Sequence, residues 1–370
     1  MRISAFAMCV LFACSLRPQQ RPSDAVVEAA KTHAYPLAST GQAFLLSEAQ
    51  KADFFLLGEL HGDNEVPELI ASLWPAMWQG GYRHVAAEVS PWAAAQLEGD
   101  SEGLKRTPGL WTHHQAAVIL GPAKHLGVIW GCDIEEMEPQ ALIQELARLN
   151  RSDASLQQIA SLTAKGYERS QAPELLRLLS TAKPQHDAAP GGISLRRSLE
   201  DTLRVESERL DREHRLIAQQ DREDVMKRQL VGHMEAGPAG KVFLRFGQSH
   251  MFRGYDLDRG VSTLGNFAAE YAIARHAVAF NVVAFGAGGK YQLNGVQDDA
   301  DQTADEPGLK LLASLATDSA TVFDVRPLRV LLHAIPEEKR TAEERNLIQW
   351  VDGYDALICF KKVTPLDEVH

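Results

Sequence analysis

The stretch 54–63 constrains the fold of this chain more than any other part of it. Residues 54–57 are apolar without polar alternation, which is typical of a strand buried on both faces of a parallel sheet. A turn with two glycines follows and carries Glu59 and His61, and residues 65–78 then repeat apolar side chains at helical spacing. In open α/β sheets, ligands bind beyond the carboxyl ends of the strands. Glu59 and His61 are therefore expected at a ligand-binding or active site. An ordinary loop with a helix-capping acid is the alternative.

Other strands of the chain also end in titratable side chains. Because the carboxyl ends of parallel strands meet at one edge of a sheet, we expect these side chains to share a crevice with Glu59 and His61. For Asp133 taken alone, a cap of the following helix is the better interpretation. The strands and their side chains are 84–89 with Glu88, 127–133 with Asp133, and 241–246 followed by His250.

The order of the remaining segments predicts the fold class. Strand signals disappear between residues 140 and 237, where a charged helix is expected over about 193–236, with Leu195 to Ile217 along one stripe. Further strands are predicted at 276–285, 320–325 and 356–360, and an acidic surface loop at 298–307. The sequence therefore predicts an α/β protein with a mostly parallel central sheet flanked by helices. A large helical insertion, about 140–237, separates the third and fourth main strands of a single domain over 23–370.

The first residues predict export. Arg2 precedes an apolar run over 3–12, followed by Ala13 and Cys14, as in a signal peptide. The residues before Cys14 resemble a bacterial lipoprotein cleavage site, although Phe12 replaces the usual small residue. We interpret 1–22 as signal peptide and tether. Lipidation of Cys14 and simple signal cleavage both stay open, in a bacterial periplasm or envelope where a lipid anchor would be the protein's contact with a membrane.

Composition narrows the possible partners. The chain has 370 residues and a formal net charge of −11, without a basic stripe, which argues against a nucleic-acid partner. A small-molecule or peptide substrate is expected, and the oligomeric state is not predicted. Cys132 and Cys359 lie in apolar runs, so buried thiols are a better interpretation than a catalytic or metal pair. A disulfide between them is left open.

Two carboxylates and two imidazoles suit two chemistries. Glu59, His61, Glu88 and His250 could hold a divalent metal, manganese, cobalt or zinc, that activates a water molecule. Alternatively, His61 acts as a general base on water, while the carboxylates orient it and hold its pKa near neutrality. The sequence has no Gly-x-Ser-x-Gly elbow, no His-Glu-x-x-His and no Walker loop. Attack by activated water is therefore favoured over a serine acyl-enzyme.

These motifs resemble, in order, those of the superfamily that joins erythromycin esterase, the ChaN haem-uptake lipoproteins and the Tiki/TraB proteins. The resemblance covers most of the chain after residue 50. The matching elements are Gly58-Glu59-x-His61-Gly62, Glu88 at a strand end, Gly131-x-Asp133, Arg222-Glu223-x-x-Met226, Gly247-x-x-His250, and residues 354–358 before Thr364-Pro365.

The resemblance implies an α/β core with a hydrolase-like cleft at the strand ends. It also implies a role for Arg222 and Asp133 in substrate binding, the Arg222 fork holding a substrate carboxylate or oxyanion. The Glu59-Leu60-His61 spacing is shorter than the Glu-x-x-His of erythromycin esterases and more like that of ChaN. Two functions follow: a hydrolase of ester, amide or peptide bonds, or a haem- or ligand-binding lipoprotein without catalysis. Histidines without a motif are interpreted as surface or packing residues: His84, His113, His114 and His125.

Overall fold

The computed structural model describes residues 22–99, 111–123, 127–188, 194–236, 240–293 and 295–366. An eight-stranded sheet has the order β1-β11-β12-β8-β2-β5-β3-β4. The pairs from β12 to β4 are parallel, whereas β1 and β11 pair antiparallel at one edge. The predicted α/β class and mostly parallel sheet are confirmed. The strands are β1 (Ala34–Pro36), β2 (Phe54–Glu59), β3 (Tyr82–Ala87), β4 (Ile129–Gly131), β5 (Lys241–Gly247), β8 (Ala279–Gly286), β11 (Ala320–Asp324) and β12 (Ala356–Phe360).

Helices cover both faces of the sheet, because successive side chains of its central strands enter two separate cores. Phe55 and Leu57 of β2 lie in one core, and Phe54 and Leu56 lie in the other. The flanking helices are α1 (Asp24–Thr32), α2 (Gln42–Lys51), α3 (Glu65–Gln79), α4 (Pro91–Gly99), α6 (His113–Leu120), α13 (Leu264–Ala274), α14 (Pro307–Leu315), α15 (Arg326–Ala334) and α16 (Ala342–Gly353).

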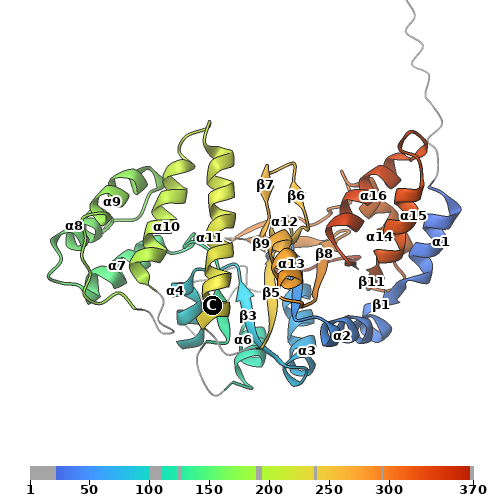
Figure 1. The fold of residues 1–370 in the computed structure, drawn as a ribbon, viewed down its shortest axis with the longest axis horizontal. Coiled ribbons are helices and arrows are strands. Elements are labelled where there is room, and N and C mark those ends of the chain that lie inside the picture. The colour runs from blue at the N-terminus through green and yellow to red at the C-terminus, as the bar shows by residue number, and fades with distance from the viewer. Residues whose placement is uncertain are drawn as a thin grey trace, which may run out of the picture.

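The predicted helical insertion lies between β4 and β5 in the chain. Figure 1 shows α7 to α10 on one side of the molecule, with α14 to α16 and α1 on the other. The insertion comprises α7 (Pro139–Leu149), α8 (Ala154–Leu162), α9 (Ala172–Leu179), α10 (Leu195–Glu208) and α11 (Arg215–Ala236).

The prediction of a single charged helix over 193–236 is wrong. The segment forms two helices, α10 and α11, and the predicted apolar stripe ends with α10. Leu199 is buried in the core, whereas Leu210 and Ile217 are 45% and 51% exposed. After the turn between the helices, α11 lies between the other helices of the insertion and the sheet (Figure 1). It carries Arg222 and Glu223, which contact Glu88 and His250.

Short strands outside the main core were not predicted, because they are too short or too polar for a periodic pattern. Part of the acidic loop predicted at 298–307 is strand, since β10 (Val296–Asp299) pairs with β9 (Lys290–Leu293). A second hairpin joins β6 (Tyr255–Asp256) to β7 (Val261–Ser262). A one-turn helix, α12 (Gln248–Met251), follows β5 directly.

Two other expectations concern the cysteines and the membrane. Cys132 and Cys359 are buried and not disulfide-bonded, as expected for inert thiols. None of the helices in the described ranges has the length and apolar composition that a membrane span requires. The signal segment and Cys14 lie outside the described residues, so export and lipidation stay predictions.

We expect Gly58→Ala to destabilise the protein by about 1–3 kcal/mol, the usual cost of overpacking. A Cβ at Gly58 would lie 2.8 Å from the Cα of Gln248, so that α12 would have to move away from β2. Urea unfolding measures the change. The matched control is Gly232→Ala within α11, where a Cβ meets nothing within 4 Å. That substitution should stabilise the helix by up to about 1 kcal/mol, and equal effects of both would contradict the close approach of α12.

Candidate active site

The strand order brings the predicted side chains to one place. Because β5 lies between β2 and β3, and β4 lies outside β3, the carboxyl ends of four parallel strands are adjacent. Glu59 ends β2, Glu88 follows β3, Asp133 follows β4, and His250 lies in α12 after β5. The predicted crevice is therefore formed by residues that are far apart in the chain.

His61 is the side chain of this cluster that solvent reaches most easily. Its Nδ1 lies 3.0 Å from Oε1 of Glu59, and its Nε2 lies 3.2 Å from Oε2 of Glu88. The side chain is 21% exposed, against 2% for Glu59. Gly62 makes the turn possible, since its φ is +89° and a Cβ there would lie 2.2 Å from the carbonyl oxygen of Gln292.

Glu88 is the centre of the hydrogen-bond network. Its Oε2 accepts a hydrogen bond of 2.5 Å from the backbone N–H of Gly247 and faces His61. Its Oε1 accepts a hydrogen bond of 2.9 Å from Nη2 of Arg222 and lies 3.2 Å from Nε2 of His250. Both carboxylate oxygens are thus satisfied by groups from four other parts of the chain.

Arg222 directs its guanidinium at protein carboxylates. Its Nε donates to Oδ1 of Asp133 at 3.0 Å, and its Nη2 contacts Glu88 and lies 3.1 Å from Oε2 of Glu136. Asp133 also accepts a hydrogen bond of 2.8 Å from the backbone N–H of Ile134, which lies in a loop. The interpretation of Asp133 as a helix cap is wrong, because the following helix α7 begins at Pro139 and its N-cap residue is Glu138. In this arrangement the fork of Arg222 holds acids of the site in place, and binding of substrate by Arg222 or Asp133 stays a prediction.

Arg245 belongs to the site and was missed by sequence reasoning. Its Nε donates to both carboxylate oxygens of Glu59 at 3.0 Å, and its Nη1 donates to Oε1 of Gln115 at 3.0 Å. Its guanidinium lies 5.0 Å from the centroid of the Trp111 ring. The signal was present, because an arginine inside an otherwise apolar strand must find a buried partner.

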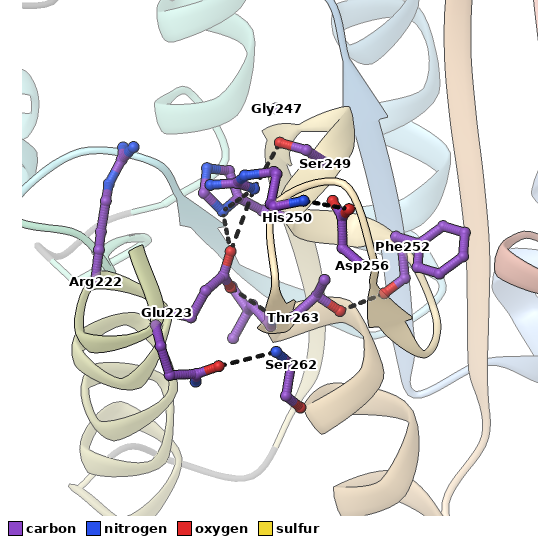
Figure 2. Close-up of polar contacts among 12 residues, drawn as sticks. Arg222, Glu223, Gly247, Ser249, His250, Phe252, Asp256, Ser262 and Thr263 are labelled. Atoms are coloured by element: carbon purple, nitrogen blue, oxygen red, sulfur yellow. Dashed lines mark hydrogen bonds and ion pairs between the residues drawn. The ribbon is translucent and has the colours of Figure 1, made fainter. Parts of the chain in front are cut away.

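Glu223 contacts Nδ1 of His250, the ring nitrogen that does not face Glu88. Figure 2 shows this contact between Glu223 and His250. Oε1 of Glu223 lies 2.6 Å from Nδ1 of His250, and its Oε2 accepts a hydrogen bond of 2.8 Å from the backbone N–H of Leu264. Arg259 lies 3.4 Å from the same carboxylate and donates to Oγ of Ser249 at 2.8 Å. The two neighbouring residues of the sequence motif therefore have different partners. Arg222 pairs with Glu88, and Glu223 pairs with His250.

Charge interactions outweigh burial in setting the protonation of the cluster. Burial lowers the pKa of His61, but Glu88 and Glu59 raise it to about 10. Burial likewise opposes the charge on His250, whose pKa Glu88 and Glu223 raise to about 9. Burial raises the pKa of Glu88, yet His250 and His61 bring it well below its usual value. Both imidazoles are thus protonated and Glu88 is ionised at neutral pH. The expectation that the carboxylates hold the pKa of His61 near neutrality is wrong, because two of them contact one ring.

A cleft of about 660 Å³ opens beside His61. His61, Glu88 and Arg222 line one part of it, and Tyr167 and Arg169 of the insertion line another. The insertion therefore forms a wall of the candidate active site. The volume is in the range of small-molecule sites in proteins.

The predicted metal site does not fit the observed donors. Among the described residues, no group of three or more His, Cys, Asp or Glu side chains is placed to hold a metal ion. Both ring nitrogens of His61 and both of His250 face carboxylates instead. A metal ion would have to displace these contacts.

The histidines without a motif occupy the expected kinds of position. His84 is buried and stacks on Trp130 at 4.1 Å between ring centroids, which is a packing role. His113 and His114 are exposed on α6, and His125 lies outside the described residues.

No protein-family model and no curated protein matches this chain. A solved structure of a Bacillus cereus protein aligns with a TM-score of 0.65 and 14% identity, over 94% of this chain and 99% of that chain. A mutant of the erythromycin esterase EreC in its open conformation aligns with a TM-score of 0.59 and 12% identity, over 94% and 98%. ChaN of Campylobacter jejuni with cofacial haem reaches a TM-score of 0.33 at 14% identity, over 70% and 89%, which is too low to support an argument. The resemblance predicted from the motifs is confirmed in the fold, at identities that show the fold alone.

We expect Arg245→Met to cost about 3–5 kcal/mol of unfolding free energy, because it removes the arginine that is paired with the buried carboxylate of Glu59. Both side chains of this pair are at most 3% exposed. The matched control is Arg177→Met, which breaks the exposed pair with Glu174 and should leave the unfolding midpoint almost unchanged. Urea unfolding of both variants decides the point, and a small effect of Arg245→Met would show that the pair is not essential to the fold.

Proposed function

We propose that this chain is a hydrolase that cleaves an ester, amide or peptide bond of a small molecule or peptide with water activated by His61. The observation that supports this most directly is the position of His61 between Glu59 and Glu88 at the wall of the cleft. A partly exposed imidazole that two carboxylates orient at the wall of a cleft is a group that can act as a general base. The likeness to the EreC fold agrees with this proposal.

The proton transfers follow from the contacts of the ring. With Nδ1 facing Glu59, the deprotonated Nε2 accepts a proton from water as the oxygen of that water bonds to the substrate carbonyl carbon. The imidazolium that forms is stabilised by Glu59 and Glu88 and then donates the same proton to the leaving group. Arg245 and Arg222 take no part in these transfers; they hold the two carboxylates in position.

The alternative function is binding of haem or another ligand without catalysis. Haem iron needs an accessible axial nitrogen, oxygen or sulfur. In the cleft, both ring nitrogens of His61 are within hydrogen-bond distance of carboxylates, which favours proton transfer over ligation of iron.

We expect His61→Ala to lower hydrolysis by roughly 100-fold or more, the usual contribution of a general base. Measured near pH 10, where the stabilisation by the protonated ring is lost, its melting temperature should stay near that of the parent, because Glu59 keeps Arg245 and Glu88 keeps Arg222 as partners. Initial rates on a panel of chromogenic esters and peptides, with thermal melts by circular dichroism, measure both. The control is His114→Ala, since that ring is 60% exposed on α6 and pairs with an exposed glutamate.

Two results would contradict this function. The first is an active parent whose rate His61→Ala leaves unchanged. The second is a parent inactive on the whole panel that gives a stoichiometric Soret shift on titration with haemin, which would favour the binding alternative.

We expect the rate to rise with pH from 7 towards about 10, nearly tenfold for each unit, because the deprotonated His61 is the active form and its pKa is about 10. Stability should change in the opposite direction. A pKa raised from 6.5 to about 10 means that the folded state binds the proton more tightly, so the stabilisation is complete below about 6.5 and lost as the pH rises to about 10. Rates in this range, with NMR titration of the His61 ring, test the shift; a plateau of activity around pH 7 would contradict it.

A further inference from the structure

A second cavity, of about 370 Å³, lies at the same edge of the sheet as the active-site cleft. No residue among those described lines both cavities. The short helix α12 connects the two, because Gln248 and Ser249 line the second cavity while His250, the next residue, contacts Glu88 of the cleft lining. The second cavity is therefore a separate site, and the proposed hydrolysis does not use it.

Aromatic rings form much of its lining. Phe252, Tyr255, Trp350 and Tyr354 all line the cavity. The rings of Trp350 and Tyr354 stack at 6.0 Å between centroids, and Phe252 packs edge-on to Tyr354 at 5.9 Å. Hydrogen bonds fix two of them, since the Tyr354 hydroxyl donates to the carbonyl oxygen of Gln248 at 2.6 Å and Trp350 Nε1 donates to Glu306 at 3.2 Å. The cavity thus has a defined shape before any ligand enters.

The charged side chains of this lining are all acidic. Asp256, Asp258 and Glu306 line it, and none of its described lining residues is Lys, Arg or His. The neighbouring arginines have other partners: Arg253 pairs with Asp355, and Arg259 is directed at Ser249 and Glu223. Aromatic faces together with carboxylates attract a cation and have no complement for an anion.

We propose that this aromatic cavity binds a small organic cation, a quaternary or protonated amine. The negative faces of aromatic rings stabilise such a cation while its alkyl groups replace water against the same rings. Asp256 supplies a charge for it. Oδ1 of Asp256 accepts backbone N–H bonds from Asp258 and Arg259, both at 3.0 Å, which fixes the carboxylate in place. Figure 2 shows Asp256 and Phe252, which both line this cavity.

The test compares choline with 3,3-dimethyl-1-butanol, its uncharged analogue of the same shape, by saturation-transfer NMR on the full chain. We expect saturable binding of choline and of tetramethylammonium, and much weaker binding of the alcohol. Trp350→Leu keeps an apolar side chain but removes a ring, so it should weaken choline binding by about two- to thirtyfold. Asp256→Asn should weaken choline binding without changing that of the alcohol. The matched control is Trp78→Leu in α3, another half-buried tryptophan outside the cavity, which should leave choline binding unchanged.

Equal binding of choline and the alcohol would overturn the proposal, because the cavity would then select only for apolar shape. No binding of either cation would overturn it as well. If Trp350→Leu fails to fold, Asp256→Asn alone decides: unchanged affinity for choline rejects a cation site. The measurement uses no hydrolysable substrate, so its outcome is independent of the proposed hydrolase activity.

Discussion

The arrangement of this protein depends on one carboxylate that stays ionised inside it. Glu88 contacts His61, His250, Arg222 and the backbone N–H of Gly247, which come from the turn after β2, from α12, from α11 and from the end of β5. A buried carboxylate is stable only where such donors replace the water it has lost. The charge on Glu88 therefore requires these four segments to meet at one point, and it ties the insertion to the sheet.

Two arginines of the site pair with its other buried carboxylates and replace the water that these have lost. Arg245 holds Glu59 from within the core, and Arg222 holds Asp133 and Glu88 at the wall of the cleft. Each is planar and can donate two hydrogen bonds in fixed directions, which an ammonium group cannot do. The imidazole of His61 is consequently oriented by carboxylates that are themselves fixed, and this is the preorganisation that acid–base chemistry needs.

The helix α12 connects the active site with the aromatic cavity. It begins directly after β5 and approaches β2 so closely that position 58 has room only for glycine. The hydroxyl of Tyr354 donates a hydrogen bond to the carbonyl oxygen of Gln248, the first residue of α12. Four residues are enough to place His250 beside Glu88 and Ser249 beside the rings of the second cavity, because the two side chains leave the helix in different directions.

Local pattern determined much of this protein. The apolar runs, such as 54–57, and their glycine breaks were sufficient to place the main strands and to put Glu59, Glu88, Asp133 and His250 at strand ends, since these signals depend on neighbouring residues. Strand order was decided only by long-range pairing: Arg245 and Glu59, 186 residues apart, meet because β5 inserts between β2 and β3. The break between α10 and α11 and the high pKa of His61 were likewise beyond the sequence, because the direction of a helix and the charge of a buried group depend on what packs against them.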